Sequence, residues 1–477
     1  MVCRFFGVCL VIVVVAFRGI CGETLPPDWP TPSKFTPGSE TRFRLPFFVN
    51  MLTYGDEDQP LYNVLYVPRN YDPQKAYPLF VRFPPQGSKP STEEFTKVTN
   101  GQAFVLGVSW FIYMKTRDNS TFRIPTDQEM YAPVIQWVVS NWNIDRRRVF
   151  IGGFSAGGFA AGTYGTVPSM RHLVTHFVIM GAGIRESCEL KQVAGKYAFI
   201  AVGKDDQNYN SAKSAVTKLQ TAGCKVTFFE EPGVGHAIGT GMSAALEAWL
   251  KTFDPAVHAD EWLKSAQTLE KADKSRACDI YARVATIGEG DVKGKTARSK
   301  LEELEGPALR AYENALVLLK SRKYTEATKA FRDANSEAQK IRSTRLALLC
   351  QLGAEEVLEW QYGEQIAAME EAHLTRRFYE ACLYAEDGVK RYTAALKGWE
   401  KPFKDRMAQF YMKKTETAAK DDPAVCADQS KLVSARSAIW SGNAVAAKQA
   451  LEQIAKKYEG KAEGIEAKHL LQRIGNQ

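Results

Sequence analysis

The chain has 477 residues and a net charge of +8; hydrophobic residues make up 45% of it and charged residues 24%. This length exceeds one ordinary hydrophobic core, so we expect two or three domains, and the composition is that of a globular protein and not of a disordered chain. Lys and Arg exceed Asp and Glu by similar amounts before and after Phe253. The charge therefore forms no cluster of the kind that binds nucleic acid, and we expect no nucleic acid partner.

The start of the chain has the pattern of a secretory signal. Arg4 precedes an apolar run over residues 5–17, and small residues at 19–22 offer a cleavage site. The run is shorter than the ~20 residues that a helix needs to cross a bilayer, and no later segment is long and apolar enough. We expect residues 1–22 to be a signal peptide and the mature protein to be secreted or periplasmic, without a membrane span. An uncleaved membrane anchor is the alternative.

Cysteines after the signal are even in number but sparse, and none lies in a zinc-type or C-x-x-C spacing. An exported chain meets an oxidising environment, which permits disulfides. Cys188 and Cys224 are therefore expected to be either a bridge or two buried thiols. The spacing predicts no metal site.

Strands and helices alternate after an irregular lead-in over residues 23–41, which is rich in Pro, Ser and Thr. Short apolar runs bounded by turn residues predict strands at 62–66, 77–83, 103–108, 149–151, 177–180, 198–202 and 226–229. Helical spacing predicts helices at 127–142, 156–164, 211–222 and 243–253. This alternation predicts an α/β fold with a mainly parallel sheet covered by helices on both faces. We place the lead-in and first strands in residues 23–60 and the α/β domain in 61–254.

Residues 255–477 are predicted to form a separate all-α domain, because Gly and Pro become scarce and Ala, Leu, Glu and Lys recur at helical spacing. Residues in this part repeat at an offset of 170, as in Ala277 with Ala447 and Leu301 with Leu471. Small residues where helices touch, with Tyr324 after a turn, resemble tetratricopeptide-type repeats. The regular period is not kept, so a generic helical bundle is the alternative.

The strongest chemical signal is the segment Gly153-Phe154-Ser155-Ala156-Gly157, which follows a predicted strand and opens a predicted helix. A nucleophile elbow needs this arrangement, with the serine on a strained turn that requires small neighbours. Gly153 and Gly157 supply them. We therefore predict Ser155 as a nucleophile, which needs a base to take its proton.

Two later loops provide a base and an acid. His236 lies in a turn-rich loop after the strand 226–229, whereas His172 and His176 flank a predicted strand and are expected in core or surface positions. Asp205 and Asp206 both follow the strand 198–202. The order Ser, Asp, His is that of α/β-hydrolases, in which the carboxylate orients the imidazole. Either aspartate fits by position.

The segment 141–158, N-W-N-I-D-R-R-R-V-F-I-G-G-F-S-A-G-G, resembles α/β-hydrolase esterases of the polyhydroxybutyrate-depolymerase and feruloyl- or acetylxylan-esterase type. The stretch from Pro232 to His236 is similar to the segment that carries the family's histidine. The resemblance covers residues 61–253. It implies a serine esterase fold, and it implies Asp206 as the acid, three residues after Gly203, with Asp205 as the alternative.

The oxyanion hole departs from that family. The resemblance implies His-Gly after the strand 77–83, but the chain has Pro84-Pro85, and proline has no backbone N–H. We expect the N–H of Gln86, with Gly87 as the other candidate, to pair with the N–H of Ala156. Loss of one such donor typically lowers turnover by ~100- to 1000-fold.

These patterns predict an exported serine hydrolase that cleaves small-molecule or polymer-borne carboxylic esters through an acyl-enzyme, without a cofactor. Two alternatives stand beside it. One is a degenerate hydrolase that acts as a binding or scaffold protein and recruits a protein partner through its helical domain. The other is a prolyl-oligopeptidase-like serine peptidase, although the chain has no room for a gating domain before the hydrolase.

Overall fold

The computed structural model describes residues 30–43, 53–54, 57–60, 62–86, 88–109, 114–115, 121–122, 131–374, 377–393, 399–407 and 423–475. The expected signal peptide and Gly87 lie outside these residues. None of the helices in these ranges combines the length and apolar character that a bilayer crossing requires.

An eight-stranded sheet organises the first half of the chain, in the order β1-β4-β6-β5-β9-β10-β11-β12. Pairing is antiparallel between β1 and β4 and between β4 and β6, and parallel across the rest. The strands, in sheet order, are Glu40–Phe43, Asn63–Tyr66, Phe104–Gly107, Tyr77–Phe83, Ile144–Phe154, His176–Met180, Tyr197–Gly203 and Lys225–Glu231. The predicted α/β class with a mainly parallel sheet is therefore confirmed.

Helices cover both faces of this sheet because its central strands are apolar on both sides. On β5, Val81 belongs to the core shared with α2 and α3, while the adjacent Phe80 packs on the other side with residues of α1 and α5. This alternation follows the two-residue period of a strand. The helices are α1 (Glu93–Val98), α2 (Ala132–Asn141), α3 (Ala156–Tyr164), α4 (Tyr209–Thr221) and α5 (Thr240–Lys251), with short 3-10 turns η1 (Pro32–Lys34), η3 (Pro168–Met170) and η4 (Leu190–Gln192).

A second, small sheet has the order β3-β2-β7-β8. Its strands are β2 (Thr53–Tyr54), β3 (Glu57–Pro60), β7 (Met114–Lys115) and β8 (Thr121–Phe122), and every pairing in it is antiparallel. The sequence pattern did not predict these short strands.

The predicted elements occur close to their predicted bounds, with one larger difference. The strand expected at 149–151 extends over Ile144–Phe154 as β9. Its first half is rich in charge, which hides the strand in a hydropathy pattern. Arg146 pairs there with Glu356, and Arg148 Nε donates to Asp145 Oδ2 at 2.6 Å. These partners make a buried or half-buried position possible for the charged side chains.

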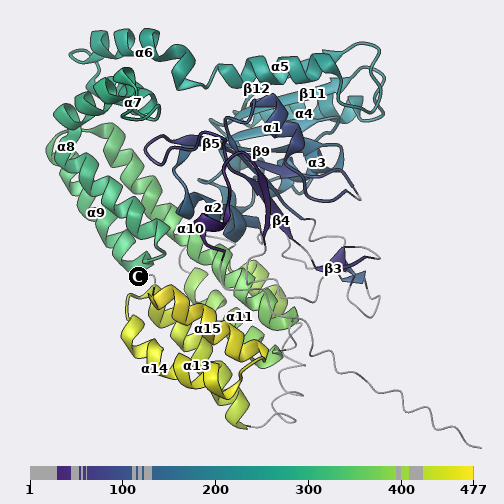
Figure 1. Cartoon of the computed structure of the whole chain (residues 1–477), viewed down its shortest axis with the longest axis vertical. Coiled ribbons are helices and arrows are strands. Elements are labelled where there is room, and N and C mark those ends of the chain that lie inside the picture. The colour runs from purple at the N-terminus through teal and green to yellow at the C-terminus, as the bar shows by residue number, and fades with distance from the viewer. Residues whose placement is uncertain are drawn as a thin grey trace, which may run out of the picture.

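The second half of the chain is helical, as predicted, and no strand occurs after Glu231 in the described ranges. Figure 1 shows its helices descending along one side of the sheet domain, from α6 at the top to α13, α14 and α15 at the bottom. The helices are α6 (Pro255–Leu269), α7 (Lys274–Ala285), α8 (Val292–Lys320), α9 (Tyr324–Lys340), α10 (Thr344–Leu374), α11 (Phe378–Tyr392), α13 (Pro423–Trp440), α14 (Ala444–Lys457) and α15 (Ala462–Gly475).

The 170-residue offset relates two helix pairs. Ala277 lies on α7 and Leu301 on α8, while Ala447 lies on α14 and Leu471 on α15. In each pair the two helices contact one another, and Ala277 and Ala447 are both buried. The offset thus marks two helical hairpins of similar packing.

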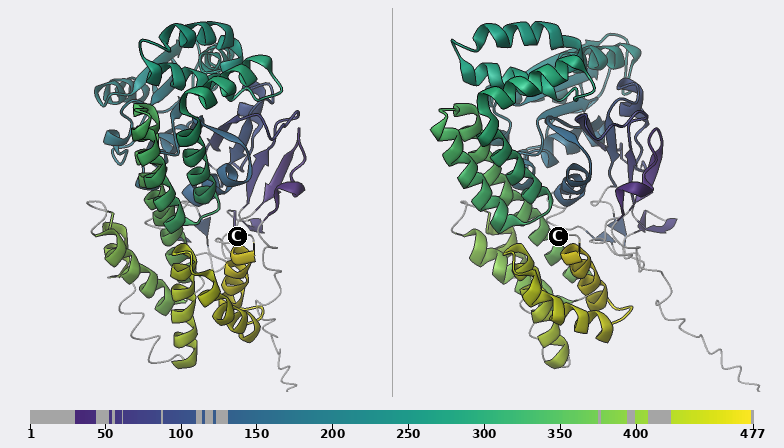
Figure 2. Two further views of the ribbon diagram at one scale, coloured as in Figure 1. Left: turned by 90° about the vertical axis from the view of Figure 1, so that its left-hand side faces the viewer. Right: turned by 60° about the vertical axis from the view of Figure 1, so that its left-hand side comes forward.

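The two halves share one hydrophobic core. The hydrophobic cluster on the α2 and α3 face of the sheet also contains Trp360 of α10 and Tyr324 and Phe331 of α9. Both views in Figure 2 show the green helices α8, α9 and α10 side by side against the sheet domain. Polar contacts cross the same boundary, in the pairs Arg146–Glu356, Arg171–Glu355 and His172–Glu359. The helical half is therefore packed firmly on the sheet domain.

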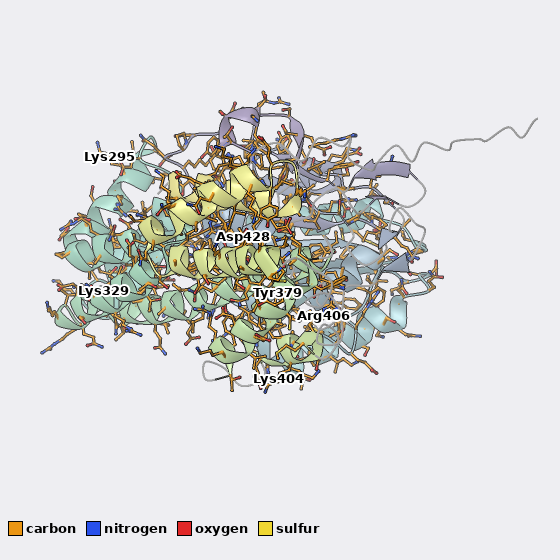
Figure 3. The ribbon with its side chains drawn as sticks, turned by 90° about the horizontal axis from the view of Figure 1, so that it is seen from below. Lys295, Lys329, Tyr379, Lys404, Arg406 and Asp428 are labelled. Carbon is orange, nitrogen blue, oxygen red and sulfur yellow. The ribbon has the colours of Figure 1, made fainter. Side chains whose placement is uncertain are left out.

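Buried ion pairs hold the lower helices together. Arg406 Nε donates to Glu370 Oε1 at 2.8 Å, and Arg436 Nη2 donates to Glu466 Oε1 at 2.8 Å. Figure 3, which views the molecule from below, labels Arg406 together with Asp428 of α13. Asp428 accepts hydrogen bonds from Lys431 and Lys457, and these lysines help to hold its pKa below the ordinary value against the opposing effect of burial.

Cys188 and Cys224 are buried thiols that form no disulfide in this structure. Thr166 Oγ1 lies 3.7 Å from Cys188 Sγ, and the Cys224 thiol donates to the Lys196 carbonyl at 3.4 Å. Burial raises the pKa of Cys224 to about 11, so this thiol stays protonated at neutral pH. The sequence left a disulfide bridge and two buried thiols open for this pair, and the structure contains the two buried thiols.

Candidate active site

Ser155 occupies a sharp turn between β9 and α3. Its φ of 55° and ψ of −123° lie outside the ordinary regions for a residue with a side chain. The Ser155 N–H donates to the Met180 carbonyl at 2.9 Å, which ties the turn to the end of β10. The turn thus places the serine at the carboxyl edge of the sheet, where parallel α/β sheets carry their sites.

The two glycines of the motif make room for the neighbouring strand. A Cβ added at Gly153 or at Gly157 would collide with the carbonyl oxygen of Phe83, the last residue of β5. At Gly157 it would also lie 3.0 Å from the carbonyl oxygen of Pro84. Both positions therefore require glycine because of close backbone approach.

His236 reaches Ser155 from the loop after β12. Its Nε2 lies 2.8 Å from Ser155 Oγ, a hydrogen-bond distance, and its side chain is 30% exposed. The imidazole ring packs on Phe154, with ring centroids 4.8 Å apart. The other two histidines of this half have different partners. His172 Nδ1 lies 2.7 Å from Glu359 Oε1, and His176 is stacked in the core between Phe150 and Tyr197.

The acid that meets His236 is Asp206. Its Oδ1 and Oδ2 lie 3.0 Å and 2.9 Å from His236 Nδ1, and its side chain is fully buried. A carboxylate only accepts, so Nδ1 carries the hydrogen and Nε2 faces Ser155 with its lone pair. Asp205 is exposed, and its N–H donates to the Val234 carbonyl at 3.0 Å. The structure therefore joins Ser155, His236 and Asp206 in one hydrogen-bonded chain and leaves Asp205 out of it.

Two further residues hold this chain in place, and the sequence reasoning missed both. The Asn208 N–H donates to Asp206 Oδ1 at 2.7 Å, while its Nδ2 donates to the Gly181 carbonyl at 2.8 Å. Glu231, at the end of β12, accepts from the N–H groups of Gly241 and Met242 at 2.9 Å and 2.8 Å. The D-x-N spacing after the strand is a local signal for Asn208. No local sequence signal marks Glu231, because its partners follow the loop that carries His236.

Backbone N–H groups near Ser155 supply candidate oxyanion donors. Gly158 and Phe159 donate to the Ser155 carbonyl, at 2.9 Å and 3.2 Å, whereas the N–H of Ala156 belongs to the first helical turn, which has no intrahelical acceptor. Gln86 lies in an exposed turn after Pro84 and Pro85, and Ser88 N donates to the Pro85 carbonyl at 3.0 Å. The Pro84 carbonyl oxygen lies beside Gly157, 3.0 Å from the position that a Cβ would take there. Gln86 thus follows directly on the segment that lines the Ser155 turn.

In the part of the chain that the structure describes, no cluster of three or more His, Cys, Asp or Glu side chains is arranged to hold a metal ion.

No protein-family model and no curated protein matches the sequence. Solved structures that resemble part of the chain include a thermostable esterase, with 19% identity and a TM-score of 0.31 over 38% of this chain and 53% of that one. The chain thus spans about half the length of that esterase. A Bacillus cereus carboxylesterase has 17% identity and a TM-score of 0.33, over 40% of this chain and 93% of its own. A feruloyl esterase module from Clostridium thermocellum has 15% identity and a TM-score of 0.32, over 47% and 92%.

Proposed function

We propose that the chain is a serine hydrolase that cleaves carboxylic esters through an acyl-enzyme. The observation that carries the proposal is the hydrogen-bonded chain from Ser155 Oγ through His236 to the buried carboxylate of Asp206. A serine hydroxyl becomes a useful nucleophile when a base lies within hydrogen-bond distance and a third group orients that base. Both conditions of geometry are met at the carboxyl edge of the sheet.

In the proposed reaction, His236 Nε2 takes the Ser155 proton while Oγ attacks the ester carbonyl carbon. The resulting imidazolium is stabilised by Asp206, and it then gives its proton to the departing alcohol as the C–O bond breaks. Water, deprotonated by His236, attacks the acyl-enzyme in the second half of the cycle. The tetrahedral intermediate formed by this attack then loses the bond between the acyl carbon and Ser155 Oγ, which releases the carboxylic acid, and His236 returns its proton to Ser155.

We assign the oxyanion hole to the N–H groups of Ala156 and Gln86. The negative charge that develops on the carbonyl oxygen needs two donors fixed before the reaction begins. Ala156 N–H stands at the start of α3, where the helix dipole also favours a negative charge. The two prolines before Gln86 stiffen the strand end and restrict the orientation of the next N–H.

The substrate class of the proposal is a small-molecule or polymer-borne ester. The test is hydrolysis of aryl acetates, feruloyl esters and longer acyl esters by the purified full chain, with Ser155→Ala as the control. Turnover of at least one ester by the native chain, and of none by the variant, supports the proposal. Absence of turnover on every ester would favour a binding or scaffold protein instead, and cleavage of peptides alone would favour the peptidase.

We also propose export of the chain and a tetratricopeptide-like role for its helical half. The first rests on Arg4 and the apolar run at 5–17, and the second on the two similar helix pairs α7–α8 and α14–α15. N-terminal sequencing of the secreted or periplasmic protein should give a start at about residue 23. A pull-down with the full chain as bait, in which residues 255–477 stay packed on the sheet domain, would identify a protein partner of the helices.

A further inference from the structure

A cavity of 610 Å³ lies between the start of β9 and the helices of the second half. Arg146 and Arg147 line it from β9, and residues of α8 and α10 line it from the other side. Ser155 follows the opposite end of β9, roughly 25 Å away at about 3.3 Å per residue. The volume falls within the range of small-molecule sites, about 300–1,000 Å³. The cavity is therefore large enough for a ligand and distinct from the proposed active site.

One face of α8 and one face of α10 form the helical wall. Tyr312, Leu316 and Lys320 line the cavity from α8 at intervals of four residues, which places them on the same face of that helix. Leu349 and Leu352 line it from α10. Both helices pack against α9, which lies next to each of them along the chain, so α8 and α10 run in the same direction. The wall is thus built from two helix faces that lie lengthwise along the cavity.

Among the described residues that line the cavity, Lys320 is the cation without a carboxylate partner. The arginines form the pairs Arg146–Glu356, Arg147–Asp279, Arg298–Glu313 and Arg345–Glu305. The Lys320 ammonium takes part in no hydrogen bond or ion pair with the described residues. Its side chain is half-buried, and its Nζ is not enclosed, in contrast to the unpartnered Nζ of Lys196. Lys320 therefore presents free donors to the cavity.

The charged groups beside Lys320 do not neutralise it. Glu356 is already engaged, because it pairs with Arg146 and its Oε1 accepts from Trp360 Nε1 at 3.0 Å. Burial and the Arg146 guanidinium lower the pKa of Lys320 to about 8, and the Glu356 carboxylate opposes them with a smaller effect. The amine still carries its charge on most molecules at pH 7. An anion in the cavity would supply the opposite charge that these surroundings lack.

The wall next to Lys320 is aliphatic. Leu316 lies one turn before Lys320, and the half-buried Leu349 and Leu352 face the cavity from α10. Tyr312 stands two turns before Lys320, about 12 Å away along the helix axis. Its hydroxyl has no hydrogen-bond partner among the described residues and is not enclosed. The α8 face thus offers a cation at one end, an apolar stretch, and then a hydroxyl.

We propose that this cavity binds a medium-chain aliphatic carboxylate, with its carboxylate on Lys320 and its chain along Leu316, Leu349 and Leu352. One unpaired cation matches one negative charge, which favours a monocarboxylate over a phosphate dianion. The leucines favour an alkyl chain. The proposal does not depend on ester hydrolysis.

Isothermal titration calorimetry on the full chain tests the proposal, with octanoate as the probe. Octanoate should bind, while 1-octanol, which has no charge, and acetate, which has no chain, should each bind at least about tenfold more weakly. Lys320→Met should weaken octanoate at least about tenfold. Lys295→Met is the matched control, because Lys295 is exposed on the same helix and does not line the cavity. Tm checks the folding of both variants. Absence of binding at about 10 mM octanoate, equal binding of 1-octanol, or equal affinity of the native chain and Lys320→Met would each overturn the proposal.

Reductive methylation of lysines in the native chain, read by mass spectrometry, provides a test that needs no variant. Octanoate at about ten times its Kd should slow methylation of Lys320 about tenfold, because the bound anion covers the amine. Methylation of Lys295 should not change. An unchanged rate at Lys320 while octanoate is bound would place the anion elsewhere and overturn the proposal.

Discussion

The carbonyl oxygen of Phe83 occupies the space in which a side chain at Gly157 would begin. This contact joins the end of β5 to the first turn of α3, so it fixes the Ser155 turn against the segment that leads to Gln86. Gly157→Ala should lower the free energy of unfolding by about 1–3 kcal/mol, because backbone atoms must move to admit one methyl group. Urea unfolding measures the effect. Gly290→Ala is the control, since a Cβ there meets no atom within 4 Å and the variant should match the native chain.

Gln86→Pro should lower ester turnover by ~100- to 1000-fold, because it removes one backbone donor from the proposed oxyanion hole. Gln86→Ala keeps the N–H and should retain most of the activity. The comparison separates the backbone from the side chain, and kcat is the quantity to measure. Equal activity of the two variants would show that the second donor comes from elsewhere.

Asp206→Asn should lower kcat by ~10,000-fold, since the amide no longer holds His236 in the required tautomer. Asp205→Asn changes an exposed side chain of the same loop and should alter kcat little. Steady-state kinetics on an aryl ester distinguish the two. A larger loss at Asp205 would contradict the assignment of the acid while leaving the nucleophile in place.

Glu231→Gln should lower kcat by up to about 100-fold with little change in KM, because the loop that carries His236 loses part of its anchor to α5. An amide oxygen replaces only one of the two acceptors, so we also expect a loss of about 1 kcal/mol in stability. Glu247→Gln is the control, as this half-exposed residue of α5 pairs with Lys251 at the surface. A fall in stability with unchanged kcat would reduce Glu231 to a purely structural role.

The parts of the fold that a local pattern specifies were predictable from the sequence. The strand Tyr77–Phe83 and the helix Ala156–Tyr164 occur at their predicted bounds, because each is a short apolar segment between turn residues. The first half of β9 was missed, because its charged residues hide the strand and Arg146 meets its carboxylate partner, Glu356, only in the folded chain.

The residues of the candidate site also divide into those that a local sequence pattern marks and those that only contacts in the folded chain reveal. Ser155 and His236 stand in local motifs, and the structure brings them together. The choice between Asp205 and Asp206 needed a family resemblance, because adjacent residues follow the same strand. The partners of Glu231 are backbone N–H groups on the far side of the loop that carries His236, and Trp360 packs with residues of the sheet domain. Neither contact leaves a local pattern in the sequence.

The most direct test of the proposed hydrolase is labelling of the purified full chain with a fluorophosphonate probe, followed by mass spectrometry of the labelled peptide. We expect one phosphonylated residue, Ser155, with labelling absent in Ser155→Ala and strongly slowed in His236→Ala, since the serine then lacks its base. Folding of both variants is checked by Tm. Absence of labelling in the folded native chain, or equal labelling of Ser155→Ala, would show that Ser155 is not an activated nucleophile.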